Sequence, residues 1–366
     1  MKKLGFGLMR LPMKSGAVNQ EHVNEMADYF LGQGFNYFDT AYVYHNGESE
    51  VALKKALVER HPRDSFVIAN KMPTFLVTQS SDYDKFWNEQ IERCGVDFFD
   101  YYLLHNLGEM NYANSLRHGG FEYMKQLKSG GKARKIGFSF HDKAELLDEI
   151  LAKHPEMEFV QLQINYVDWE DEGVQARRCY EVAEKHNKPV IVMTPIKGGL
   201  LADLSEDSKA VLHKIDAEAS IASWALRFAA SLPNVFMVLS GMSNIEQMRD
   251  NTGFMKDFVP LTLEEKVALD KVVAIMTGEG GIPCTACQYC VKDCPQDIRI
   301  PDVIALYNNQ LRFSFTPAHW NYYMNLTQKS GKASDCISCG VCEKLCPQHI
   351  SIIDGLQKVA GVFESE

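Results

Sequence analysis

Hydrophobic residues follow two alternating patterns over residues 1–275 of the chain. Short runs rich in β-branched and aromatic residues alternate with longer stretches in which apolar positions recur at helical spacing. This alternation is typical of strand-helix-strand units around a parallel sheet. The short runs predict strands at residues 3–9, 35–39, 65–70, 99–105, 133–139, 159–163, 189–194 and 235–239. The longer stretches predict helices at residues 21–33, 48–60, 81–94, 121–128, 143–153, 173–187, 217–231 and 245–255.

The number of these units predicts a closed barrel. Eight strand-helix units over roughly 250 residues are the expected size of a (β/α)8 TIM barrel, whose chemistry lies on loops at the carboxyl ends of the strands. A doubly wound open sheet is the alternative, and it requires a Gly-rich phosphate-binding turn between the first strand and a helix. Here the glycines Gly5 and Gly7 are followed by Met9-Arg10-Leu11-Pro12 rather than by a helical stretch. The pattern therefore favours the α/β TIM barrel.

Cysteine usage divides the chain into two parts. The first 283 residues contain only Cys94 and Cys179, whereas the remainder contains eight cysteines. Clustered thiols in a reducing compartment are more often metal ligands or redox groups than disulfides. A chain of 366 residues, 46% of them hydrophobic, has room for one large core and a small second unit. We therefore expect the barrel over residues 1–275 and a small, mainly helical, ferredoxin-like domain over residues 276–366.

The eight cysteines form two copies of the pattern C-x2-C-x2-C-x3-C-P. Three thiolates at this spacing reach three corners of a cubane cluster, and the fourth reaches the other cluster in two-cluster ferredoxins. The alternative, a tetrahedral zinc site, joins two separated C-x2-C pairs and does not use a third evenly spaced cysteine. We predict two 4Fe-4S clusters, the first held by Cys284, Cys287, Cys290 and Cys346, and the second by Cys336, Cys339, Cys342 and Cys294.

Four residues with acid, base and proton-donor chemistry follow three of the predicted barrel strands. Asp39 ends the second strand and Tyr44 follows it, Lys71 follows the third strand, and His105 ends the fourth. Because the carboxyl ends of barrel strands meet at one rim, we expect these side chains to converge there. Each alone has a structural explanation, such as a turn cap or a buried ion pair. Together they indicate a catalytic site.

The residues around this group resemble the signature of the aldo-keto reductase superfamily. The similarity lies in Gly34-Phe35-Asn36-Tyr37-Phe38-Asp39-Thr40-Ala41-x-x-Tyr44, in residues 47–50 and 136–139, in Gln163-x-x-Tyr166, and in Pro195-x-x-Gly198-Gly199-Leu200-Leu201. It implies hydride transfer between a nicotinamide and a carbonyl carbon. Tyr44 would then donate the proton, with its pKa lowered by Lys71, which Asp39 would hold in place. His105 would orient the carbonyl oxygen.

The same resemblance assigns the nicotinamide cofactor to further positions. Ser139 and Gln163 correspond to the residues that hold the carboxamide, and Ser243, Gln247 and Asn251 to those near the adenosine. Gly241 and Lys197 lie in loops suited to phosphates. The positions of Gly241 and Gln247 lack the basic residues that many members use for the 2'-phosphate, and Arg249 is the basic residue nearby. NADP(H) and NAD(H) therefore both stay open.

Three functions fit these observations. The favoured one is NAD(P)H-dependent reduction of a small carbonyl substrate, or the reverse oxidation of its alcohol, with clusters that are structural, sense redox state or relay electrons. The second is electron transfer through the clusters between a barrel-bound flavin or nicotinamide and a protein partner. A flavin such as FMN would serve as the adaptor between two-electron and one-electron steps. The third, a non-catalytic nucleotide-binding sensor, has no need of Tyr44 and Lys71.

Composition restricts the partners. The net charge is −10, and no run of lysine or arginine forms a basic stripe, so nucleic acid and anionic membrane surfaces are not expected partners. The first residues carry two lysines but no apolar stretch long enough for a signal peptide, and no later segment has the length of a membrane span. We expect a soluble, cytoplasmic protein.

Overall fold

A computed structural model describes residues 2–171, 174–278, 281–313, 323–324, 326–328 and 330–365. Contacts along the chain group it into two compact units. The first comprises Met1–Glu170, Gln175–Pro195 and Ala222–Leu261, and the second comprises Asp171–Val174, Ile196–Ile221 and Thr262–Glu366. Residues 196–221 and 262–275 thus group with the second unit by contacts, while the domain boundary at residues 275 and 276 stays a prediction.

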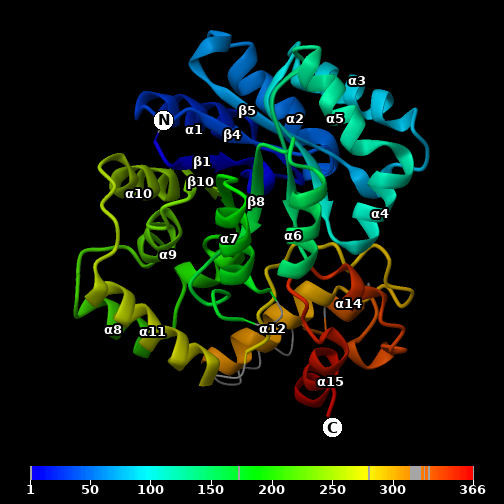
Figure 1. Ribbon diagram of the computed structural model, residues 1–366. Helices are drawn as coiled ribbons and strands as arrows, with labels where there is room; N and C mark the ends of the chain where they lie inside the picture. Colours follow the sequence, from blue (N-terminus) through cyan, green and yellow to red (C-terminus); the bar gives the residue numbers. More distant parts are fainter. Residues whose placement is uncertain are drawn as a thin grey trace. The chain divides into compact units, whose positions relative to one another are not determined.

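In the first unit, eight parallel strands of the described residues close a barrel, which confirms the predicted TIM-barrel fold. The order around the barrel is β1, β10, β9, β8, β7, β6, β5, β4. Figure 1 shows these strands surrounded by the helices that connect them. The barrel strands are β1 (Leu4–Gly7), β4 (Tyr37–Asp39), β5 (Val67–Met72), β6 (Phe99–Leu107), β7 (Ala133–Phe140), β8 (Phe159–Gln163), β9 (Val190–Met193) and β10 (Val235–Ser240).

Helices occupy most of the remaining described residues. The α-helices are α1 (Gln20–Gly32), α2 (Glu48–Leu53), α3 (Asp82–Cys94), α4 (Glu109–His118), α5 (Gly120–Ser129), α6 (Ala144–Lys153), α7 (Ala176–Lys185), α8 (Glu206–His213), α9 (Ile221–Ala230), α10 (Ile245–Lys256), α11 (Leu263–Gly278), α12 (Ile300–Phe313), α14 (Val341–Leu345) and α15 (Ile352–Phe363). Shorter helical turns are η1 (Leu8–Arg10), η2 (Tyr44–Gly47), η3 (Lys54–Val58), η4 (Arg63–Ser65), η5 (Thr74–Leu76), η6 (Lys197–Ala202) and η7 (Ala333–Asp335).

Three features of the structure were not expected from the sequence. Helices α4, α8 and α11 lie outside the predicted helices, and the single helix predicted at residues 48–60 is α2 followed by the π-helical turn η3. A two-stranded antiparallel hairpin, β2 (Met13–Lys14) and β3 (Ala17–Val18), follows η1. Its two-residue turn, Ser15-Gly16, has positive φ at both positions, the geometry that matches the twist of a tight hairpin.

Large side chains fill the inside of the barrel. Tyr37 and Phe159 are buried there, and Tyr101 lies between them with ring centroids 5.3 Å and 5.2 Å away. On β7 the position paired with Phe159 is Gly137. A Cβ atom at Gly137 would lie 2.4 Å from the Phe159 carbonyl oxygen, so the close approach of these two strands requires glycine.

The described part of the second unit has its own apolar core. Helices α12 and α15 pack together, and α8 packs against α11 (Figure 1). The core contains apolar side chains of both α12 and α15, including Ile304, Val303, Leu356 and Val359, together with several of the clustered cysteines. Among the described residues, none of the helices combines the length and the apolar character that crossing a bilayer would require.

The barrel packing predicts the effect of a single methyl group. Gly137→Ala forces a Cβ against the backbone of β8, and overpacking of this kind costs about 1–3 kcal/mol. Gly253→Ala is the matched control, because Gly253 lies on the exposed side of α10 with no heavy atom near its added Cβ, and this change stabilises a helix by about 0.5–1 kcal/mol. Thermal unfolding followed by circular dichroism should show a lower midpoint for the first variant only. Equal midpoints for Gly137→Ala and wild type would contradict this account of the barrel.

Candidate functional site

A buried ion pair joins the ends of two neighbouring barrel strands. Asp39 ends β4 and Lys71 lies near the end of β5, and the lysine Nζ donates to the Asp39 carboxylate at 2.5 Å. The same Nζ donates to the Thr40 carbonyl at 2.7 Å. Burial raises the pKa of Asp39 and lowers the pKa of Lys71, and their mutual attraction opposes both shifts. The pair places the Lys71 cation at the rim of the barrel, where its attachment to β5 and its contacts at the end of β4 fix its position.

Tyr44 lies beside this cation. It is the first residue of η2, and the Lys71 Nζ is 4.9 Å from the centre of its ring. The two residues after it, His45 and Asn46, both have positive φ. The His45 ring then accepts a hydrogen bond from the Leu11 amide at 3.2 Å, which ties the loop to the segment that follows β1.

His105 completes the group from β6. It is 2% exposed, and its ring lies edge-on to Tyr44 with centroids 6.2 Å apart. The Thr74 hydroxyl donates to the His105 carbonyl, and the Phe75 ring is 5.7 Å from the imidazole. Burial holds the pKa of His105 well below 6.5, and the positive charge of Lys71 adds to the shift. The imidazole is therefore neutral at physiological pH and can donate one N–H.

The pKa of Tyr44 corrects one expectation from the sequence. Lys71 was expected to lower it, but burial and, after it, the charge of Asp39 raise the pKa of Tyr44 well above 10. Lys71 is paired with Asp39, so the effect of its charge on the phenol does not outweigh burial and the charge of Asp39. Tyr44 therefore holds its proton firmly, and releases it only to a strong base such as a developing alkoxide.

Two of the predicted nicotinamide contacts lie at neighbouring strand ends. Ser139 is the penultimate residue of β7 and Gln163 the last of β8, and both are buried. The Ser139 hydroxyl accepts a hydrogen bond from the Asn106 amide at 2.7 Å. In the described part of the chain, Oδ2 of Asp39 and Nδ1 of His105 are buried and have no hydrogen-bond partner. Orphaned polar atoms in a catalytic group fit a site that a polar ligand completes.

The predicted adenosine contacts lie in the loop after β10, which carries Ser243, and on α10, which carries Gln247 and Asn251. The Asn244 side chain caps α10 by accepting from the Gln247 amide at 2.8 Å, and the Gln247 side chain accepts from the Ser243 amide at 2.8 Å. Asn251 is buried and donates to the Ser240 hydroxyl at 2.9 Å, so its side chain already has a structural partner. Gly241 is exposed in the same loop.

Lys197, the other predicted phosphate contact, belongs to the second unit. Its side chain is 1% exposed, and Nζ donates to the Gln348 side chain at 3.4 Å. Gln348 follows Cys346 by two residues. This hydrogen bond links Lys197 to the cysteine-rich part of the chain, and its contact with a nucleotide stays a prediction.

The eight motif cysteines line two cavities of the second unit in two groups of four. The first cavity, about 320 Å³ with part of it open to solvent, is lined by Cys284, Cys287, Cys290 and Cys346. The second, about 330 Å³, is lined by Cys294, Cys336, Cys339 and Cys342. Each cavity thus takes three cysteines from one motif and the fourth from the other.

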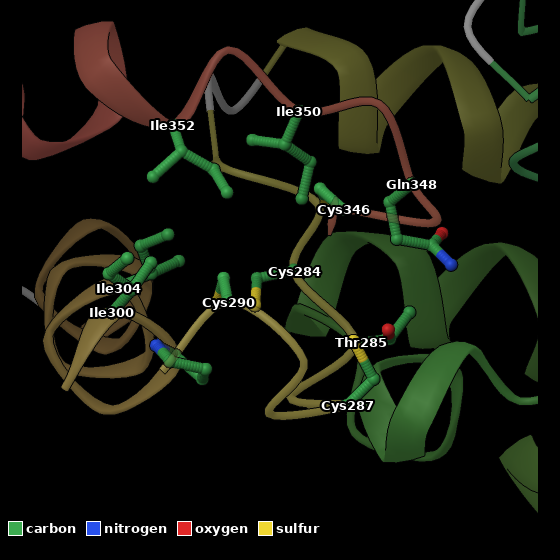
Figure 2. A pocket seen from close by; sticks show the side chains of 11 residues that line it. Cys284, Thr285, Cys287, Cys290, Ile300, Ile304, Cys346, Gln348, Ile350 and Ile352 are labelled. Atoms are coloured by element: carbon green, nitrogen blue, oxygen red, sulfur yellow. The ribbon is translucent and has the colours of Figure 1, made fainter. Parts of the chain in front are cut away.

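Mostly apolar residues form the other walls of these cavities. Figure 2 shows Cys284 and Cys290 between α12, which carries Ile300 and Ile304, and the loop that carries Cys346, Gln348 and Ile350. Burial raises the pKa of Cys284 and of Cys342 to about 11. A thiol in such a place ionises only when a cation replaces its proton, so the donor set fits a cationic iron-sulfur core.

Comparison with known proteins assigns the family. A sequence model of the Aldo/keto reductase family matches residues 3–274. The chain belongs to this family. A model of the 4Fe-4S dicluster domain matches residues 283–351, so the chain combines an aldo/keto reductase barrel with a C-terminal dicluster domain.

Individual relatives are distant. L-galactose dehydrogenase of Arabidopsis thaliana is 23% identical over 292 residues, which are 75% of this chain and 90% of that protein. The holo form of an aldo-keto reductase from Bacillus halodurans has a TM-score of 0.61 at 24% identity, with 74% of this chain and 91% of that chain covered. An aldo-keto reductase from Klebsiella pneumoniae in complex with NADPH has a TM-score of 0.61 at 20% identity, with 74% and 90% covered. Both structures share the barrel fold of this chain.

This aldo/keto reductase supports its site with a buried network that sequence reasoning did not assign. The Glu50 carboxylate accepts from the side chains of Asn70 at 2.8 Å and Gln90 at 3.0 Å. Gln90 also donates to the Lys71 carbonyl, and the Asn70 side chain accepts from the Lys71 amide. Glu50 lies in residues 47–50, which resemble the family signature, but no local pattern pairs it with Gln90, which is forty residues away.

A basic residue near the adenosine positions was also missed. The side-chain carbons of Arg10 would lie 3.5 Å from a Cβ atom at Gly241, and the Arg10 carbonyl accepts from the Ser243 hydroxyl at 2.8 Å. Arg249, the basic residue expected there, has its guanidinium over the Tyr29 ring at 5.8 Å. Arg10 follows β1, far from β10 in sequence, so only the closure of the barrel brings it to this loop.

The low pKa of His105 predicts a pH dependence of stability. The folded state keeps the imidazole neutral, while the unfolded chain takes up a proton below its ordinary pKa of 6.5. The contribution of His105 to the free energy of unfolding is therefore fully present above pH 6.5. Below pH 6.5 it falls by about 1.4 kcal/mol per pH unit. His105→Asn should reduce the difference in unfolding free energy between pH 7.5 and 5.5. The measurement is urea unfolding of both proteins, with His22→Asn, an exposed histidine, as control. An unchanged pH difference in His105→Asn would show that His105 is not the group responsible.

Proposed function

We propose that the barrel catalyses reversible, nicotinamide-dependent reduction of a small carbonyl compound to its alcohol. The observation that carries the proposal is the meeting of Asp39, Tyr44, Lys71 and His105, with Lys71 held at 2.5 Å from Asp39 and 4.9 Å from the Tyr44 ring. A structural ion pair has no need of a phenol and a neutral imidazole beside it. Such a group suits the addition of a proton to an oxygen atom that gains negative charge.

Each residue of the group has one task in this reaction. A nicotinamide held at this rim would supply the hydride for the carbonyl carbon. The neutral His105 donates a hydrogen bond to the carbonyl oxygen and orients it. Tyr44, whose raised pKa keeps it protonated, gives its phenolic proton to the same oxygen as charge develops there. Lys71 then stabilises the phenolate that remains, and Asp39 fixes the position of Lys71.

The polar residues at the rim suit a nicotinamide dinucleotide. Ser139 and Gln163 would hold the carboxamide, and the loop from Gly241 to Gln247 would hold the adenosine end. Arg10 lies beside this loop and supplies a positive charge suited to a 2'-phosphate. The NADPH carried by the similar Klebsiella pneumoniae reductase is consistent with NADP(H) as the cofactor.

The two cysteine-lined cavities would each hold a 4Fe-4S cluster. The four cysteines of each cavity would bind the four iron atoms, and the isoleucines around them would limit access of water. The ten cysteines of the chain are not joined by disulfides, which suits a reducing compartment such as the cytoplasm.

One observation also supports electron transfer as a second function. Ile300 lines both cavities, so the two proposed clusters would be neighbours. Neighbouring clusters of this kind are suited to passing single electrons, whereas a purely structural role requires no such proximity. The clusters would then exchange electrons with a partner protein.

Replacing the proposed proton donor tests the barrel's activity. Tyr44→Phe removes one oxygen and should lower kcat for aldehyde reduction by about 10²–10⁴-fold, the usual contribution of general acid catalysis. The dissociation constant for NADPH, measured by fluorescence quenching, should stay within about twofold of wild type. Tyr42→Phe is the matched control, because Tyr42 lies in the same loop but its hydroxyl donates to Glu89. A Tyr44→Phe variant with full turnover would exclude Tyr44 as the donor.

Removing single cysteines tests how the clusters are shared. Cys294 follows the first motif, yet it lines the cavity of Cys336, Cys339 and Cys342. Cys294→Ala should therefore abolish the electron paramagnetic resonance signal of the second cluster and lower the iron content to about half. Cys346→Ala should abolish the first signal instead, while Cys179→Ala, a buried cysteine outside both motifs, should leave the iron content unchanged. Loss of the first cluster in Cys294→Ala would refute the crossed arrangement.

A further inference from the structure

The second unit contains a buried lysine next to the first cluster cavity. Lys197 is 1% exposed, and its Nζ donates to the side chain of Gln348 at 3.4 Å. Gln348 is itself 5% exposed and lines the cavity of Cys284, Cys287, Cys290 and Cys346. Because an ammonium group loses its hydration when it is buried, it is retained inside a protein where negative charge or dipoles compensate the loss.

The backbone around Lys197 holds the lysine against this cavity. Lys197, Gly198 and Gly199 have φ values of 45°, 70° and 106°, three successive residues in the left-handed region. At Gly198 an added Cβ would lie 2.5 Å from the carbonyl oxygen of Thr285, which follows Cys284 directly. Glycine thus allows the turn to lie directly on the loop that carries the first cysteine.

The two cavities differ in the charges that surround them. The described residues that line the two cavities are themselves uncharged, so the charges that differ lie just outside them. Beside the first cavity, the buried ammonium of Lys197 is one hydrogen bond away from Gln348, which lines it. Beside the second, Glu343 follows Cys342 directly, and its carboxylate accepts from the amide of Ile353, which lines that cavity, at 2.9 Å. A buried cation beside the first cavity and a carboxylate beside the second favour added negative charge at the first.

We propose that Lys197 raises the midpoint potential of the first cluster above that of the second, so that a single electron entering this unit resides on the first cluster. Each reduction adds one electron from an external one-electron donor and no proton. The extra negative charge is stabilised by a nearby buried cation, in the same way that net charge and hydrogen bonds set the potentials of other clusters. The inference rests on the proposed binding of two clusters, and Lys197 acts on the potential without ligating iron.

A redox titration of the whole chain tests this role. Clusters would be reconstituted anaerobically, titrated with dithionite, and followed by electron paramagnetic resonance, with Cys294→Ala identifying the signal of the second cluster. Lys197→Met keeps the length of the side chain and removes its charge. This variant should lower the equilibrium constant for reduction of the first cluster on the order of tenfold, which lowers its midpoint potential by about 59 mV for one electron. The midpoint potential of the second cluster should stay unchanged.

Three further variants make the result specific to the buried charge. Lys197→Arg keeps the charge and should restore the wild-type midpoint, and Lys197→Gln provides a second neutral variant if the methionine variant binds less iron. Lys344→Met removes an exposed lysine between two cysteines of the second motif and should shift neither midpoint, since water and salt screen it. Unchanged midpoints in both neutral variants with full iron content would overturn the role of Lys197. A wild-type protein that binds no cluster would instead contradict the proposed function.

Discussion

The ion pair between Lys71 and Asp39 is the interaction on which the barrel's site depends. Two charges removed from water cost several kcal/mol each, and their attraction compensates this only with close geometry and further hydrogen bonds. The barrel provides both. Asp39 pairs in register with Ala69 on β5, so Lys71, two residues further along, projects from the same face. The network of Glu50, Asn70 and Gln90 then fixes the backbone of Lys71 from the other side. Burial beside this paired cation and carboxylate keeps the Tyr44 phenol protonated and the His105 imidazole neutral.

The second unit has a different constraint. Its described core is small, and buried cysteines make up part of it. Thiols in such a core ionise with difficulty, and iron atoms would replace the protons that burial otherwise retains. We therefore expect assembly of the proposed clusters to be coupled to folding. The crossing of Cys294 and Cys346 between the cavities links the two motifs, and Ile300 forms a wall of both. The two proposed cluster sites thus share part of their walls, although each keeps its own four cysteines.

Much of this architecture could be predicted from the sequence, and the exceptions have physical reasons. Buried strands of a parallel barrel are short apolar runs, so all eight were predicted, as was the family. Helix α11 was missed although Thr262 and Glu265 cap its start reciprocally, because its apolar residues show little helical periodicity. Within the site, the sequence allowed the side chains at strand ends to be assigned to one rim. It did not allow the upward shift of the Tyr44 pKa to be predicted, because that shift depends on how far Asp39 offsets the charge of Lys71. The positions of Arg10 beside Gly241 and of Lys197 beside Gln348 also arise only from folding, because each pair is far apart in sequence.

The proposed function combines a two-electron site and two one-electron sites in one chain. It requires that hydride pass directly from nicotinamide to the substrate carbon in the barrel. The most direct measurement uses NADPH carrying deuterium at the transferable position of the nicotinamide C4, a panel of small aldehydes, and mass spectrometry of the alcohols, with cluster absorbance recorded in the same reaction. Direct transfer predicts one deuterium on the carbinol carbon of each alcohol while the clusters stay oxidised. Alcohol without deuterium, formed as the clusters bleach, would show that electrons travel through the clusters and would contradict the account.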